Sequence, residues 1–353
     1  MKKPKLHKVL KRNKSKGEEA PAPTEEGLPR ITNDTVAAHR EEVIGSARKY
    51  IYPLEHSKHR IVTVSIALII AAIVIFFSYC TIALYKTQSD TTFLYRVTQV
   101  IPFPVARAGS ASVAYENYLF ELRHYIHYYQ TQAKLDFNDP KNKDQLTEFK
   151  KRALDKVVND AYIKQLAKQH NVTVSDKEVD DEVNVVRSQN RLGNSDKAFE
   201  DVLKDYWGWS VNDFKRSLKS EMLAQKLVST LDTDTHTRAD AALNELKSGA
   251  SFADVAKKYS DEAETKNNGG EYGYPIDKAN RNLSADVTDQ LFKLPAGQYS
   301  DVINTGYTLE IVKVIEVNGD KVRAAHIVFN FKDVNTYIND LKDQQKARLF
   351  IKN

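Results

Sequence analysis

The hydrophobic pattern sets one long apolar segment apart from the rest of the chain. No charged residue occurs from Ile61 to Tyr85, and Arg60 and Lys86 flank this segment. A helix needs about 20 apolar residues to cross the hydrocarbon core of a bilayer, so residues 61–85 are long enough to span it with some tilt. A buried helix of a soluble domain would seldom lack a polar face over such a length.

A cleaved signal peptide is the second explanation for this segment. Its apolar region would be about 7–15 residues long and would follow a short basic start, whereas sixty residues precede Ile61. Tyr79 is too bulky for the processing site that would make Cys80 a lipid-carrying cysteine. We therefore expect residues 61–85 to form an uncleaved signal anchor.

The distribution of charge predicts the orientation of this anchor. Residues 1–60 contain 14 Lys and Arg against 8 Asp and Glu, whereas the remainder contains 38 against 39. The positive-inside rule then places the N-terminus in the cytoplasm and residues 86–353 on the extracytoplasmic side of the cell membrane. The stretch from Met1 to about Pro29 is too polar to bury a core, so we expect the basic tail at 1–60 to be largely disordered. Because the rest of the chain is almost neutral, we expect no nucleic-acid partner.

After an expected linker at 86–109, the pattern becomes helical through residues 110–236. An aromatic stripe opens this region and forms either core or a peptide-binding surface, and its helical spacing favours core. Ser175 and Glu178 have the spacing of a capping box at the start of a later helix. We therefore expect an all-helical domain at 110–236. The stripe consists of Tyr115, Tyr118, Leu119, Leu122, Tyr125, Ile126 and Tyr129.

The sequence argues against several kinds of chemistry. Cys80 is the single cysteine, which excludes an internal disulfide framework and a cysteine-based zinc cluster. His124 and His127 are a possible metal pair on one helix, but no adjacent ligand set completes it, so a solvated face is favoured. The motifs of phosphate loops, zinc proteases and serine hydrolases do not occur. We expect neither a metal nor an organic cofactor.

From about residue 237 the pattern changes to short helices and strands. Two alternating runs at 309–317 and 321–331 are separated by Asn318-Gly319, a strong hairpin signal. We expect a small antiparallel sheet with helices at 237–331. A C-terminal extension at 332–353 should hold a helix and a short run that could add an edge strand. The predicted fold class is α+β, with a single N-terminal transmembrane helix followed by an all-helical domain and then this mixed domain.

Two stretches of this last domain resemble the parvulin-type (PpiC, or rotamase) peptidyl-prolyl isomerase domain. They are LKSGASFADVAKKYSDEAETKNNGGEYGYP, from Leu246, and LFKLPAGQYSDVINTGYTLEIVKV, from Leu291. The preceding helical block with its anchor is similar to the chaperone half of the SurA, PrsA and PpiD group of extracytoplasmic foldases. The resemblance implies an enzyme without a cofactor that acts on X-Pro bonds of unfolded or nascent exported polypeptides.

The resemblance departs from the family pattern at its first strand. The family begins with a strand that reads Ala-Arg-His-Ile-Leu, and no such string precedes residue 238. A matching string occurs instead at Arg323–Phe329, after the last strand, and it contains His326. We interpret this as a circularly permuted parvulin domain whose first strand lies at 321–331. A second parvulin repeat is the alternative, but about 25 residues are too few to form one.

The resemblance also implies a set of site residues. When Ile311–Val314 is aligned with the family's Ile-Ile-Lys-Val, Glu310 falls where the family has its second histidine. Glu262 falls at the Cys or Asp position of the family's loop. The implied catalytic residues are His326, Glu310 and Glu262. The implied proline pocket consists of Tyr272, Leu283, Val287 and Phe292.

Whether His326 and Glu310 meet depends on the register of the predicted hairpin. A three-residue loop at 317–319 would place Glu310 directly opposite His326 on one face of the sheet. A two-residue turn at Asn318-Gly319 would pair His326 with Ile311 and send Glu310 to the other face. The sequence leaves both registers open.

Two functions compete on these observations. The first is an isomerase that assists the folding of exported proteins, which the loop and the Ala-His-Ile-Val string favour. The second is a chaperone that holds unfolded chains while its parvulin-like domain serves as a scaffold with His326 as a core histidine. Glu310 in place of histidine favours the second.

Overall fold

The computed structural model describes residues 32–51, 54–188 and 195–352. The chain forms two compact units, Met1–Phe76 and Phe77–Asn353, which are considered separately. Helix α1 (Asn33–Ile51) lies in the first unit, so the tail expected to be largely disordered contains one helix. The stretch 1–31, also expected to be disordered, lies outside the described residues.

Helix α2 (Leu54–Thr81) contains the apolar segment and continues as a π-helical turn at Ile82–Lys86. Within the described residues, Arg60–Lys86 is the one helical stretch long and apolar enough to cross a membrane. Its mean hydropathy is 2.9 over the most apolar window, and none of that window is buried in the protein. A helix that is apolar on all sides and unburied is typical of a membrane span.

The second unit begins with structure where the sequence pattern predicted a linker. Residues 86–109 hold helix α3 (Thr92–Val100) and strand β1 (Pro104–Ala108), which pairs with β2 (Ala111–Ala114). The prediction of a linker was wrong because Pro102 and Pro104 end a helix and begin a strand, and neither position requires a backbone donor.

The helical block follows, and three of its helices, α6, α7 and α8, begin at serines that cap them. Ser175 and Glu178 form the predicted capping box, and Ser210 forms a second one with Asp213. Gly208 ends α7 in the left-handed conformation (φ 68°), which glycine adopts without a steric penalty. The helices are α4 (Tyr115–Thr131), α5 (Lys143–Gln169) after a 3-10 turn at Pro140–Asn142, α6 (Asp176–Ser188), α7 (Asp196–Trp207) and α8 (Val211–Leu231).

The aromatic stripe on α4 is mainly core. Tyr115 and Tyr118 are fully buried, as are Leu119 and Leu122. The stripe becomes half-buried farther along the helix, where Tyr129 stacks on Phe149 of α5 at 4.4 Å between ring centroids. The core interpretation is therefore confirmed for the first half of the helix.

The C-terminal half of the unit is an α+β domain built on a four-stranded sheet with the order β3-β6-β5-β4. The long antiparallel pair of β5 and β6 forms its centre. Its elements are α9 (Thr233–Lys247), α10 (Phe252–Tyr259), a 3-10 turn (Lys266–Asn268), β3 (Ile276–Asp277), α11 (Ala285–Leu291), β4 (Ile303–Asn304), β5 (Thr308–Asn318) and β6 (Lys321–Asn330).

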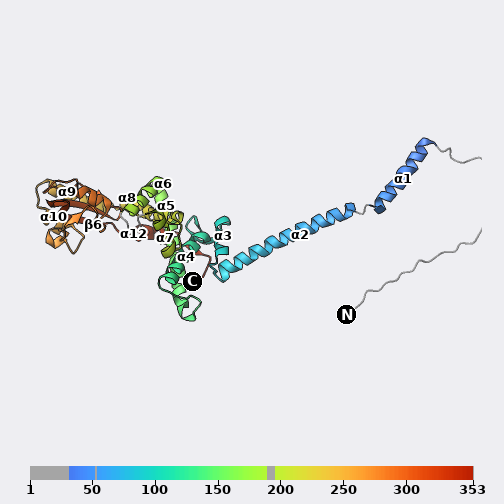
Figure 1. Ribbon diagram of the computed structural model, residues 1–353, viewed down its shortest axis with the longest axis horizontal. Helices are drawn as coiled ribbons and strands as arrows, with labels where there is room; N and C mark the ends of the chain where they lie inside the picture. The colour runs from blue at the N-terminus through green and yellow to red at the C-terminus, as the bar shows by residue number, and fades with distance from the viewer. Residues whose placement is uncertain (1–31, 52–53, 189–194, 353) are drawn as a thin grey trace, which may run out of the picture. The chain divides into compact units, whose positions relative to one another are not determined.

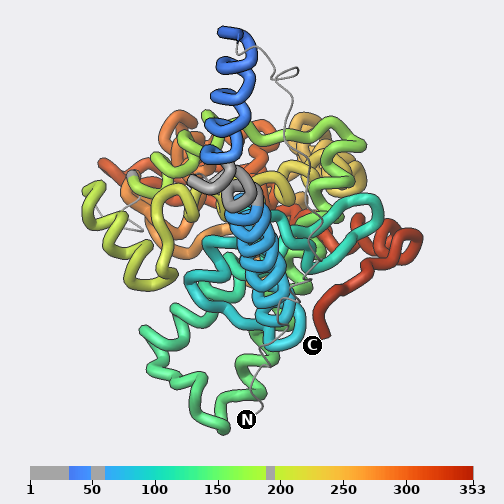
Figure 2. The backbone as a smooth tube through the Cα atoms, turned by 90° about the vertical axis from the view of Figure 1, so that its right-hand side faces the viewer, coloured from blue at the N-terminus to red at the C-terminus, as the bar shows by residue number. Residues whose placement is uncertain are grey.

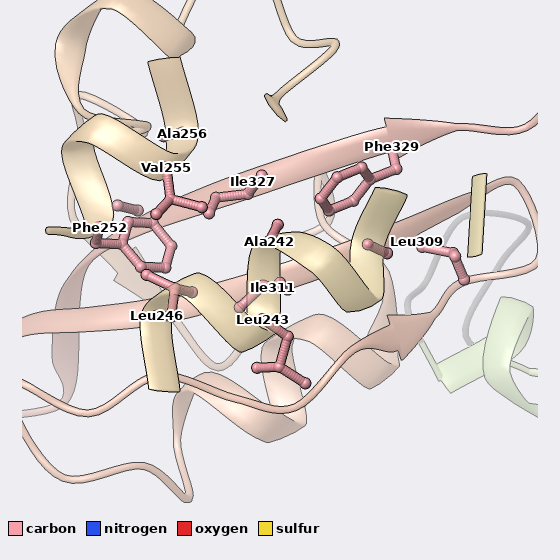
Figure 3. Close-up of a cluster of buried hydrophobic side chains, with 12 residues drawn as sticks. Ala242, Leu243, Leu246, Phe252, Val255, Ala256, Leu309, Ile311, Ile327 and Phe329 are labelled. Carbon is pink, nitrogen blue, oxygen red and sulfur yellow. The ribbon is translucent and has the colours of Figure 1, made fainter. Parts of the chain in front are cut away.

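The two faces of this sheet carry two separate cores. Odd-numbered residues of the central pair, such as Ile311 and Ile327, pack with α9 and α10, as Figure 3 shows. Even-numbered residues, such as Val312 and Ala324, pack with α11. The alternation follows from the period of two along a strand. His326 is an even-numbered residue of β6 and therefore lies on the face of the sheet that packs against α11.

The chain then returns to the helical block. Helix α12 (Val334–Gln344) follows the sheet, and β7 (Arg348–Leu349) pairs with β1, giving a three-stranded sheet of order β2-β1-β7. The predicted edge strand at the C-terminus therefore forms, but it joins the sheet beside α4 and α5 rather than the parvulin-like sheet. Figures 1 and 2 show the C-terminus beside the blue-green start of this unit.

Candidate functional site

His326 lies in the interior of the four-stranded sheet, with its side chain almost buried (residue exposure 8%). Its backbone N–H donates to the carbonyl of Gly270 at 2.8 Å, which attaches the loop before β3 to the middle of β6. On the side chain, Nε2 lies 3.0 Å from Oγ1 of Thr265, and Nδ1 lies 3.7 Å from Oε2 of Glu310. The imidazole is thus held between a hydroxyl and a carboxylate.

The loop can approach His326 so closely because Gly270 has no side chain. Gly270 has φ of +80°, and a Cβ placed there would lie 2.3 Å from the carbonyl oxygen of His326. An L-residue is disfavoured in this conformation and would collide with the strand backbone. The Gly269-Gly270 pair therefore permits the contact that brings Thr265 to the imidazole.

A β-bulge decides that Glu310 and His326 share a face. At the hairpin end Asn318 pairs with Lys321, so the turn residues are Gly319 and Asp320. Ile315 is then an extra residue between Val314 and Glu316, which shifts the register by one. Beyond the bulge His326 pairs with Val312, two positions from Glu310.

Both registers considered from the sequence were therefore wrong. Gly319 (φ +63°) occupies the first position of a two-residue turn, where a left-handed glycine is favoured. The turn thus lies one residue later than Asn318-Gly319, and Glu310 pairs with Val328. With this turn alone, Glu310 and His326 would lie on opposite faces of the sheet. The bulge shifts the register by one residue, so the two side chains share a face and Glu310 reaches His326 diagonally.

Tyr272 connects this polar cluster to an apolar one. Its ring lies 4.1 Å from the His326 ring between centroids, and its hydroxyl is buried without a hydrogen-bond partner. Burial, and secondarily the nearby carboxylate of Glu310, raises the pKa of Tyr272 above its ordinary value, so the phenol stays neutral. A neutral, unpartnered hydroxyl of this kind can donate a hydrogen bond to a bound carbonyl.

The four residues suggested for a proline pocket belong to one cluster on this face. Val287 is buried in the core around α11, and the other three pack against that core as partly exposed side chains. The structure therefore brings these residues together on the side of the sheet that carries His326. They are Tyr272, Leu283, Val287 and Phe292.

Glu262 is placed differently from Glu310. It lies half-exposed in the loop after α10, where its backbone makes two hydrogen bonds. Its N–H donates to Oγ of Ser260 at 3.3 Å, and its carbonyl accepts from the N–H of Lys266 at 3.1 Å. Thr265, three residues later, makes the contact with His326 instead. In the sequence Thr265 is only one polar residue of the implied loop. Its contact with His326 depends on the path of the loop over β6, which the glycines permit and the sequence does not show.

Neither histidine considered as a metal pair is placed like a ligand. His127 bonds through Nε2 to the carbonyl of Asp205 at 3.0 Å, and His124 stacks on Trp209 at 4.5 Å between centroids. Across residues 32–51, 54–188 and 195–352, no three His, Cys, Asp or Glu side chains gather in a way that could hold a metal ion. The His326 cluster consists of hydrogen-bonding groups beside an apolar surface.

Two family models match the chain in sequence. The SurA-like N-terminal domain matches residues 55–228, and the PPIC-type PPIase domain matches residues 223–316. The chain belongs to the parvulin-type SurA/PrsA-like family. In this family context the helical block is the SurA-like domain, and the four-stranded sheet with its helices is the parvulin domain.

Individual relatives carry the same names. Foldase protein PrsA of Caldanaerobacter subterraneus is 27% identical over 184 residues, which are 46% of this chain and 56% of the relative. Chaperone SurA of Methylobacillus flagellatus is 34% identical over 116 residues, 31% of this chain and 25% of the relative. The match thus spans about half of the first relative and a quarter of the second. Among solved structures, the peptidylprolyl isomerase PrsA of Bacillus anthracis is 22% identical, covers 54% of this chain and 88% of that chain, and has a TM-score of 0.18.

The PPIC-type match and the fold differ at the strand that bears His326. The match begins at residue 223, inside helix α8, and ends at residue 316, before β6. Yet β6 lies inside the sheet, between β3 and β5. The parvulin domain of this SurA/PrsA-like chain is therefore completed by a strand that lies after the matched segment.

Proposed function

We propose that this chain is a membrane-anchored, extracytoplasmic peptidyl-prolyl cis-trans isomerase that assists the folding of exported proteins. The observation that carries the proposal is the polar cluster of His326, Glu310 and Thr265 beside an apolar surface within a PPIC-type domain. The names of the relatives, foldase and chaperone, support the same function.

The reaction needs a site of this composition. Rotation about an X-Pro amide must pass a barrier of roughly 18–20 kcal/mol, because it breaks amide resonance. No covalent intermediate is required, so an enzyme needs only to hold the proline ring and to stabilise the twisted amide better than the planar one.

In our proposal, Leu283 and Phe292 hold the proline ring together with Tyr272 and the buried Val287. His326, fixed by Thr265 and Glu310, forms the polar floor beneath the twisted amide. The neutral hydroxyl of Tyr272 is the available donor for the carbonyl oxygen before proline. Glu262 would act near that carbonyl only if its loop moves on binding.

The decisive experiment measures isomerisation of an Xaa-Pro peptide series by the full chain in detergent. We expect acceleration that falls by roughly 100-fold in His326→Ala, the scale seen when a stabilising polar group is removed from an active site. His170→Ala changes an exposed histidine outside this domain and serves as the matched control. An accelerated rate that His326→Ala leaves unchanged would contradict the proposed site.

A second candidate function is a holdase without turnover, and one specific observation favours it. Glu310 places a carboxyl group where the family has a second histidine, and it lies beside the imidazole. If the full chain leaves the isomerisation rate unchanged but suppresses aggregation of an unfolded client, the holdase function replaces the isomerase.

The membrane anchor is tested independently. We expect the full chain to remain with the membrane during extraction at alkaline pH, because Arg60–Lys86 is apolar on all sides. In intact cells, protease added from outside should cut residues 86–353 and spare the basic tail. Release of the full chain by alkaline extraction, or the reverse protection pattern, would contradict the proposed topology.

A further inference from the structure

The helical block contains a strand edge that no described residue pairs with. Strand β2 is an outer strand of the order β2-β1-β7, so one side of it is open within the described part of the chain. Ala108 pairs with Ala111 across the two-residue turn Gly109-Ser110, so these two residues exchange backbone hydrogen bonds. The next pair, Arg107 with Ser112, is then a non-bonded pair. The N–H and C=O of Ser112 therefore point away from β1, toward the open edge.

This edge borders a cleft of about 360 Å³. Four consecutive residues, Ser110 to Val113, form one wall, and helices α4, α5 and α8 form the rest. Phe120 and Val157 provide buried apolar floor. A strand edge beside an apolar floor is the arrangement that receives an extended peptide as an additional strand.

The charges of the cleft indicate which peptide it fits. Two acidic lining residues, Glu121 and Asp160, are both paired with Lys156, at 3.6 and 2.9 Å. Arg216 is paired with Glu116 at 2.6 Å. The charges left over among the described lining residues are two exposed lysines one helical turn apart on α5.

These two lysines are Lys164 and Lys168. As solvated surface residues they would need no ligand, and Lys168 also complements the negative end of the α5 dipole. Their place beside an unpaired strand edge gives them a second role. A carboxylate carried by a peptide on β2 would meet both charges.

We propose that this cleft binds an extended, acidic segment of an unfolded polypeptide, which adds to the edge of β2 as an extra strand. The site is separate from the His326 cluster and does not depend on isomerase activity. It recognises backbone groups through Ser112 and acidic side chains through Lys164 and Lys168. Proline is not needed in the bound segment.

The test uses the full chain in detergent and a labelled octapeptide without proline, in which Thr and Val alternate with Asp. We expect saturable binding in fluorescence anisotropy that weakens as salt is raised. A peptide with Lys in place of Asp should bind at least tenfold more weakly. Alternate backbone N–H groups of a strand point to the same side, so the peptide has two sets of alternate nitrogens that can be methylated. Methylation of the set that faces β2 should abolish binding.

Variants place the peptide on the protein. The double reversal Lys164→Glu with Lys168→Glu should weaken binding about tenfold, as expected for two surface charge contacts. The matched control is Lys143→Glu with Lys151→Glu, two exposed lysines of the same helix that lie outside the cleft. Ser112→Pro removes the outward donor without removing a hydrogen bond to β1 and should weaken binding about fivefold.

Other outcomes overturn the proposal. Equal binding of the Asp and Lys peptides, or equal weakening by the reversal and its control, would show that the contact is nonspecific. If Ser112→Pro fails to fold, the two backbone-methylated peptides test strand addition instead. Strong binding of both methylated peptides would exclude it. Isomerisation of a short Xaa-Pro peptide, measured on the same variants, should stay at the wild-type rate, which separates this site from the proposed function.

Discussion

The hydroxyl of Thr265 lies 3.0 Å from Nε2 of His326, although 61 residues separate them in the chain. The carboxylate of Glu310 lies on the opposite, Nδ1 side of the same ring. The Thr265 hydroxyl is within hydrogen-bond distance of Nε2, so it holds the plane of the imidazole beside Tyr272.

Removal of the Thr265 hydroxyl should therefore lower isomerase activity without unfolding the domain. Thr265→Val keeps the shape of the side chain but leaves Nε2 without its partner, and we expect a loss of about fivefold in kcat/KM. Thr265→Ser retains the hydroxyl and should stay near the wild-type value. Equal activity of the Val and Ser variants in the Xaa-Pro peptide assay would show that this contact does not position His326.

Two glycines of the same loop provide a matched pair for stability. Gly270→Ala would place a Cβ 2.3 Å from the His326 carbonyl, whereas a Cβ on Gly273 meets nothing within 4 Å. Both have positive φ, +80° and +79°, so backbone strain is similar. We expect a loss in the free energy of unfolding of about 1 kcal/mol for Gly273→Ala and about 3 kcal/mol for Gly270→Ala.

Thermal unfolding followed by circular dichroism measures this difference. Gly270→Ala should also lower isomerase activity, because the Thr265 loop must move away from the strand. A melting temperature that drops equally in the two variants would show that the close approach of Gly270 to β6 contributes nothing beyond its φ angle.

The C-terminal strand should stabilise the helical block and leave the isomerase domain unaffected. Ile351 is buried (4% exposed), whereas Leu349 on the same segment is 46% exposed. We expect Ile351→Asp to cost about 3 kcal/mol in unfolding free energy and Leu349→Asp less than about 1 kcal/mol. Denaturant unfolding followed by tryptophan fluorescence reports on this block through Trp207 and Trp209. A loss of isomerase activity in folded Ile351→Asp would contradict the separation of the two domains.

Stability should also fall as pH is lowered from 7 to 5. Burial lowers the pKa of His124 to about 4, from an ordinary value of 6.5. The unfolded chain therefore binds a proton in this range that the folded chain does not, so stability rises with pH between about 4 and 6.5. The expected loss attributable to His124 at pH 5 is about 2 kcal/mol of unfolding free energy.

His124→Phe keeps an aromatic ring against Trp209 and should remove this part of the pH dependence. His170→Ala, at an exposed position, should retain the wild-type slope. Denaturant titrations at pH 5 and pH 7 measure the difference. An unchanged slope in His124→Phe would assign the acid sensitivity to other groups.

Local features of this protein could be predicted from the sequence because they depend on neighbours along the chain. The capping box of Ser175 and Glu178, the helix Val211–Leu231 and the strands that bear Glu310 and His326 follow from periodicity and from capping chemistry. The apolar segment at 61–85 is determined in the same way, since length and the absence of charge are properties of the sequence alone.

Only the tertiary structure decided which distant residues meet. The bulge at Ile315 and a turn one residue later than expected set the diagonal contact of Glu310 with His326. The path of the loop over β6 selected Thr265 rather than Glu262. Strand β7, near the end of the unit's sequence, paired with β1, near its beginning. Each of these depends on a register or on a close backbone approach, and a shift of one residue would reverse it without changing the hydrophobic pattern from which the strands were predicted.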